Sequence, residues 1–151
     1  MNTKFLRAVK STIDKLVVDF AQAQSTPTNF LDLDDVTAAE EVLASTDPAV
    51  IWELGSFEEY PQDPLYALSF SVGVRTFQDA ANYSLLSMAS DLSELFQSNT
   101  YFEITDSSDT VESAKKGTLI ITSFTLNQQT YDKTSGVRLG TVVARATRWL
   151  S

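Results

Sequence analysis

Acidic side chains are the residues of this sequence best suited to chemistry, because carboxylates can transfer protons and bind hard metal ions. Glu53, Glu58 and Glu59 supply the residue type that hydrolyses glycosidic bonds, a reaction that needs two carboxylates at a defined separation. Nothing in their spacing establishes that separation. Residues 58–64 are expected to form an exposed acidic loop with Pro61 and Pro64, and adjacent acids on such a loop are typically only solvated. We therefore expect no glycosidase site here.

A second acidic group suggests calcium binding, since calcium is held by several oxygen ligands. It consists of Asp32, Asp34 and Asp35. The helix-loop-helix calcium template requires glycine at its sixth position and glutamate at its twelfth, where this sequence has Thr37 and Leu43. Helix capping and solubility explain these aspartates better, and we expect no bound metal.

The sequence contains neither cysteine nor histidine. It therefore lacks thiolate nucleophiles and disulfides, and also the side chain that most often transfers protons near neutral pH. Glycine-rich phosphate-binding motifs are absent as well. We predict that the protein is not an enzyme and has no cofactor; an enzyme that relies on carboxylates alone is the third hypothesis for its function.

Length and composition predict a single domain over residues 1–151. The chain is 43% hydrophobic and 21% charged, which is close to the globular average, and this length is enough to bury one core. Its apolar runs are shorter than the roughly 18 residues of a membrane-spanning helix, and its N-terminus lacks a signal-peptide core. We expect a soluble protein of a reducing cytoplasm, without membrane contact.

Two main helices are predicted from apolar residues that recur at helical spacing. The first runs from Lys4 to Gln24, with Thr3 as its N-cap, and the second runs from Asp79 to Ser98. A short additional helix is expected near Val36 to Leu43. The polar face of the first helix carries mixed charges, so its apolar face is expected to pack on a core rather than on a membrane.

Strands are predicted where β-branched and aromatic residues dominate or alternate with polar ones. They cover Ala49–Phe57, Leu65–Phe77, Tyr101–Thr105, Gly117–Tyr131 and Val137–Leu150. The last two are joined by five residues that contain glycine, which predicts a hairpin. The expected fold class is α+β: a mixed or antiparallel sheet, two main helices packed on one face and a long C-terminal β-hairpin.

Charge is segregated along the chain. Residues 26–112 carry seventeen acids and one base, whereas residues 1–25 and 113–151 are each net positive, and the total is −9. Oppositely charged regions can be neutralised within one fold or by a neighbouring copy, and the alternative is that the charge serves solubility alone. The arginines of the last strand are better explained as ion-pairing partners than as a nucleic-acid site, because the total charge would repel a phosphate backbone.

The order of these elements, at this length, resembles the tail terminator or tail completion proteins of tailed bacteriophages. The features that carry the resemblance are the helix around Leu6–Phe20, the strands 49–57 and 65–77, the helix 79–98 and the hairpin 117–150. It implies a virion structural protein, assembled in the host cytoplasm, that forms a homo-oligomeric ring, commonly a hexamer. Such a ring caps the tail tube, stops its polymerisation and contacts the head-side connector proteins.

Two sets of charged residues are assigned to this assembly. We expect contacts between subunits at Arg138, Arg145 and Arg148, and acids that face the lumen or a partner at Glu58, Glu59 and Asp63. Heterologous contacts close into rings when each subunit presents two complementary surfaces. An acidic lumen would let DNA pass without specific binding. Ion pairs within one chain are the alternative explanation for both sets.

Two further functions compete with the tail terminator. The first is another phage neck or tube subunit that assembles into rings through the same kind of contacts. The second is an acidic mimic of DNA that blocks a nucleic-acid-binding protein, which the central acidic region would suit. The mass of the protein in solution distinguishes an assembling subunit from a monomeric mimic.

Overall fold

The computed structural model describes residues 3–24, 28–34, 48–60, 65–77, 83–105, 115–127, 130–131 and 135–148. Two helices lie within these ranges, α1 (Thr3–Gln22) and α3 (Tyr83–Leu95). The strands are β1 (Asn29–Asp32), β2 (Ala49–Glu59), β3 (Leu65–Phe77), β4 (Tyr101–Thr105), β5 (Lys115–Leu126), β6 (Thr130–Tyr131) and β7 (Ser135–Arg148). The helix expected at 36–43 and the acid Asp63 lie outside the described residues.

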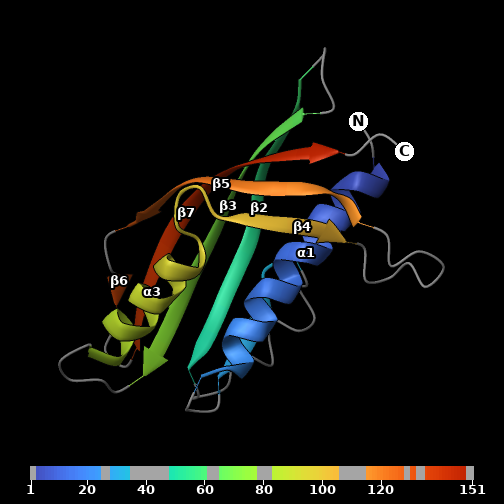
Figure 1. Ribbon diagram of the computed structural model, residues 1–151. Coiled ribbons are helices and arrows are strands. Elements are labelled where there is room, and N and C mark those ends of the chain that lie inside the picture. Colours follow the sequence, from blue (N-terminus) through green and yellow to red (C-terminus); the bar gives the residue numbers. More distant parts are fainter. Residues whose placement is uncertain are drawn as a thin grey trace.

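The strands form one sheet in the order β1-β2-β3-β7-β5-β4, with the two-residue β6 beside β7 (Figure 1). The β1–β2 pair is parallel and the other pairs are antiparallel. This confirms the α+β class and the mixed sheet. The strand β1 was not predicted, because four residues with an aspartate among them give no periodic signal.

The two long strands β5 and β7 pair antiparallel, from Gly117 opposite Arg148 to Leu126 opposite Gly140. The register shifts between Ile121 and Ser123, so one extra residue is accommodated in β5. The short strand β6 pairs with β7 as well, and residues 132–134 of the expected turn lie outside the described ranges.

The core lies between the helices and one side of the sheet. Apolar residues of β3 at alternate positions point into it, since successive side chains of a strand point to opposite faces. Phe5 of α1 packs on Tyr66 with ring centroids 4.9 Å apart, and Phe96, directly after α3, packs on Phe70 at 5.5 Å. The two helical segments therefore contact the same alternating set of β3 side chains. We call this side of the sheet the inner face and the opposite side the outer face.

Both main helices end earlier than predicted. In α1, the Gln24 amide hydrogen bonds to the carbonyl of Ala21, a tightened final turn that ends the helix at Gln22 rather than at residue 24. The helix α3 ends at Leu95 rather than Ser98. After it, the Thr100 amide donates to the Gln97 carbonyl in a separate turn, where Asn99 has a φ of 67°. The predicted start at residue 79 lies outside the described residues.

Candidate docking surface

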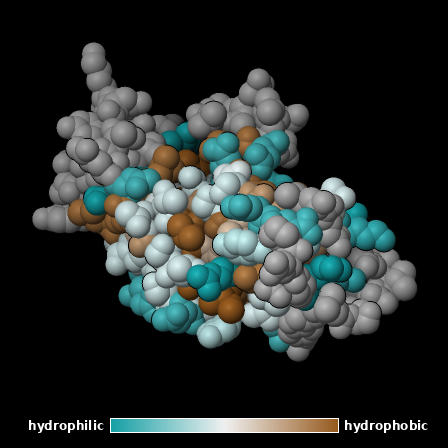
Figure 2. Space-filling view, turned by 90° about the horizontal axis from the view of Figure 1, so that it is seen from above, coloured by the Kyte–Doolittle hydropathy of each residue, from teal (hydrophilic) through white to brown (hydrophobic). Residues whose placement is uncertain are grey.

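The outer face of the sheet carries mostly small and polar side chains. On β3 these are Ala67, Ser69 and Ser71, which are half-buried, while their inward-facing neighbours are buried. The exposed fraction is 66% for Tyr101 on β4 and 41% for Val143 on β7. Viewed from above, small hydrophobic groups are separated by pale and hydrophilic residues (Figure 2), so the described surface in that view has no single apolar patch.

The strand register aligns one residue from each of five strands into a row across the outer face. The row runs Glu58, Ala67, Arg145, Ile120, Tyr101, through successive paired positions of β2, β3, β7, β5 and β4. It places a predicted acidic residue and a predicted interface arginine on the same face. Neighbouring strands lie about 4.8 Å apart, so the Glu58 and Arg145 backbones are separated by roughly 10 Å.

The three predicted interface arginines do not lie on one face. Arg145 is exposed on the outer face, whereas Arg138 and Arg148 share the alternation of the buried residues Val142 and Ala144 and are half-buried on the inner face. The Nε atoms of Arg138 and Arg148 are buried without a hydrogen-bond acceptor among the residues that the structure describes. Only Arg145 is thus placed for contact with a partner across the open side of the sheet.

The predicted acids are also divided between the faces. Glu58 and Glu59 lie in β2 rather than in the loop expected over residues 58–64, because they pair with β3. Glu58 pairs with Ala67 and points to the outer face, and Glu59 pairs with Tyr66 and points to the inner side. Glu53, opposite Ser71, is a further exposed acid on the outer face. Strand β1 pairs with β2 over residues 49–52. Beyond Trp52, the described part of the chain places no strand on that side of β2, which leaves residues 53–59 as an acidic sheet edge.

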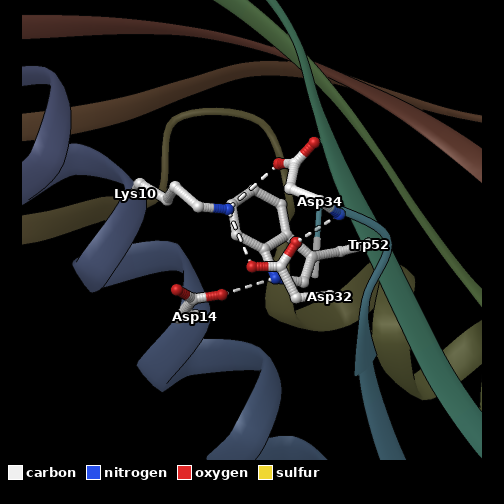
Figure 3. A network of polar contacts seen from close by, with 5 residues as sticks. All are labelled: Lys10, Asp14, Asp32, Asp34 and Trp52. Atoms are coloured by element: carbon white, nitrogen blue, oxygen red, sulfur yellow. Dashed lines mark hydrogen bonds and ion pairs between the residues drawn. The ribbon is translucent and has the colours of Figure 1, made fainter. Parts of the chain in front are cut away.

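A polar network connects α1 to the other end of β2 (Figure 3). Lys10 bonds to Asp32 at 2.8 Å and to Asp34 at 3.0 Å, and its ammonium lies 4.5 Å from the ring centre of Trp52. The Trp52 indole N–H donates to Asp14 at 2.7 Å. Two of the three aspartates considered for calcium, Asp32 and Asp34, therefore form ion pairs with a lysine, and Asp35 lies outside the described residues. The described residues contain no group of acids that could hold a metal ion.

The charges in this network favour a structural role over a catalytic one. We call the group formed by Lys10, Asp14, Asp32, Asp34 and Trp52 the clasp. Burial lowers the pKa of Lys10, but the hydrogen bonds of Asp32 and Asp34 and the charges of Asp32 and Asp14 outweigh it, so the pKa lies above its ordinary value. Burial raises the pKa of Asp14, against the opposing effects of the Trp52 hydrogen bond and the Lys10 charge. A lysine held in its charged form cannot act as a base or nucleophile near neutral pH. Sequence reasoning missed the clasp because its members come from three separate segments.

The clasp predicts opposite outcomes for two substitutions of Asp14. The change Asp14→Asn keeps an acceptor for the indole and should alter the free energy of unfolding at pH 7 by less than about 1 kcal/mol. The change Asp14→Ala leaves the indole N–H without its acceptor and should cost about 1–3 kcal/mol. Urea denaturation measures both, and Asp19→Asn, an exposed position on the same helix, is the matched control. Equal losses for Asn and Ala would contradict the role of the hydrogen bond.

The Asp14 carboxyl also makes the stability of the folded protein depend on pH. Because the folded-state pKa of Asp14 lies above the ordinary value of 3.8, the folded protein binds this proton more tightly than the unfolded chain. The contribution of Asp14 to the free energy of unfolding is therefore fully present below the ordinary pKa of 3.8, and it is lost as the pH rises from that value through the raised pKa of the folded protein. The stability of Asp14→Asn relative to the wild-type protein should increase over that interval.

Comparison with known proteins identifies the fold. No protein-family model and no curated protein matches this sequence. The chain is similar to a solved structure whose name states no function, with a TM-score of 0.65, 14% sequence identity, and coverage of 97% of this chain and 98% of the other. At that identity the likeness shows a shared fold. None of the described helices is long and apolar enough to cross a membrane.

Proposed function

We propose that the protein is a structural component of a phage virion, a tail terminator that forms a ring at the head-proximal end of the tail tube. The observation that carries the proposal is the outer face of the sheet, which no described helix covers and which presents an exposed arginine and an acidic edge in one row. A surface of this kind suits docking to another protein, and the described residues form no catalytic constellation.

The arrangement of elements supports the same proposal. In the tail terminator architecture, β5, β6 and β7 correspond to the long C-terminal hairpin, and α1 and α3 to the two helices on one face. Contacts of both helical segments with β3, through Phe5–Tyr66 and Phe96–Phe70, agree with that correspondence. Ring closure needs two different complementary surfaces on each subunit, and the acidic β2 edge and the outer face of β7 with its exposed arginine are the two surfaces proposed for it.

The acidic residues have a role in this proposal that does not require a ligand. Carboxylates near a lumen repel the phosphate backbone, so DNA passes the ring without being retained. Glu58, Glu59 and Asp63 are the acids proposed to face the lumen or a partner. Of the three arginines, Arg145 is proposed at the subunit contact, because Arg138 and Arg148 are half-buried on the inner face. The tail tube on one side and the head-side connector on the other are the expected partners.

Electron microscopy of the purified protein tests this function. At neutral pH and moderate salt, we expect isolated rings, commonly of six subunits, that do not stack into tubes. Raising the ionic strength should loosen them, because salt screens contacts between exposed charges. Continuous tubes would instead indicate a tube subunit, and single particles at every salt concentration would contradict a ring. A monomer that binds a basic nucleic-acid-binding protein tightly would favour DNA mimicry.

A further inference from the structure

We infer that the outer face receives a second copy of this chain, and that Arg145 of one copy pairs with Glu58 on the acidic β2 edge of the next. This inference rests on the proposed function and names the contact that would hold the assembly together. It selects one of three candidate arginines and one of the candidate acids, on the basis of the strand register.

The surroundings of Arg145 favour a partner from outside the subunit. Its cross-strand neighbours on the outer face are Ala67 and Ile120, which offer no acceptor. Among the described residues, no carboxylate forms an ion pair with Arg145, although the side chain is exposed. Exposed Val143, two residues along the same strand and on the same face, adds apolar area beside the charge. An exposed arginine with apolar neighbours of this kind can bind a carboxylate through two parallel hydrogen bonds.

The β2 edge is complementary in charge to the surface around Arg145. Glu58 and Glu53 are both exposed and both point to the outer face, and residues 53–59 contain no base. The β2–β3 pair projects past the rest of the sheet at the top of Figure 1, so its edge can reach a neighbouring molecule. Within one chain, Glu58 and Arg145 stand two strands apart and form no ion pair in the structure.

Charge reversal on each side of the contact tests the pairing. The variants Arg145→Glu and Glu58→Arg each bring like charges together at every interface, and each alone should associate roughly tenfold more weakly or worse. An equimolar mixture of the two should restore assembly. When the two variants alternate, the introduced glutamate faces the introduced arginine at one interface, and the native arginine faces the native glutamate at the next. Light scattering with mass determination measures all three samples.

Two control variants carry the same charge changes elsewhere. Lys15→Glu on α1 and Glu94→Arg on α3 alter exposed residues on the helices and should assemble like the wild-type protein. Circular dichroism confirms that each reversed variant is folded. If a reversal unfolds the monomer, Arg145→Gln and Glu58→Gln replace it, and each should still weaken association.

The possible outcomes distinguish a failure of the Arg145–Glu58 pairing from a failure of the proposed function. If wild-type protein assembles and the reversed variants assemble equally well, the pairing is wrong and the ring proposal stands. If each variant is monomeric and the mixture stays monomeric, the two residues act within their own chain, and the pairing is again wrong. If the wild-type protein does not assemble under any condition, the proposed function fails together with the inference.

Discussion

Replacing Trp52 with alanine should lower the free energy of unfolding by about 3–5 kcal/mol. The indole is 1% exposed and meets Phe70 edge-on at 6.1 Å. It also bonds to Asp14 and lies under the Lys10 ammonium, so it connects α1 to β2 through three kinds of contact. Urea denaturation followed by circular dichroism gives the loss directly.

Trp52→Phe is the matched variant for this prediction. It retains most of the apolar contact with the core and removes the indole N–H, so it should cost less than Trp52→Ala. A loss below about 1 kcal/mol for Trp52→Ala would show that the tryptophan is not an anchor of the fold, in contrast to buried aromatic residues in general.

Phe96→Ala should also cost about 3–5 kcal/mol. Its ring is 0% exposed and lies between Phe70 of β3 at 5.5 Å and Phe102 of β4 at 6.3 Å. Because this ring joins the end of α3 to two strands of the sheet, its loss leaves a cavity at the point where the helix meets the core. Thermal unfolding should show a correspondingly lower Tm.

Tyr101→Ala is the control for Phe96. It removes an aromatic ring of similar size only five positions further along the chain, but 66% of this side chain is exposed on the outer face. Its effect on unfolding should be well below that of Phe96→Ala, since little apolar area returns to water. Equal losses at the two positions would mean that the division into inner and outer faces is incorrect.

Local sequence patterns predicted the strands in which each side keeps the same degree of burial over most of the strand. The bounds of β3 and β4 agree with the prediction, and from Leu65 to Val72 the side chains of β3 alternate between half-buried and buried positions. Pairing choices carry no such local signal. The parallel partner β1 and the register shift between Leu54 and Ser56 depend on strands far apart in the sequence, so they emerged only from the structure.

The candidate surface was predicted in its residue types but not in its geometry. Arg138 and Arg148 occupy the same alternate positions as Val142 and Ala144, so the sequence did contain the signal that separates them from Arg145. The clasp had no such signal, because Lys10 meets Asp32 and Asp34 only after α1 has packed across β1 and β2. Ion pairs between distant segments follow from tertiary packing rather than from periodicity.

Sedimentation of the purified wild-type chain over a wide range of protein concentration tests whether the protein assembles. We expect one discrete particle with a mass several times the 16.7 kDa of a single chain, which dissociates as salt is raised. A sedimenting species of 16.7 kDa at every concentration and at low salt would contradict it.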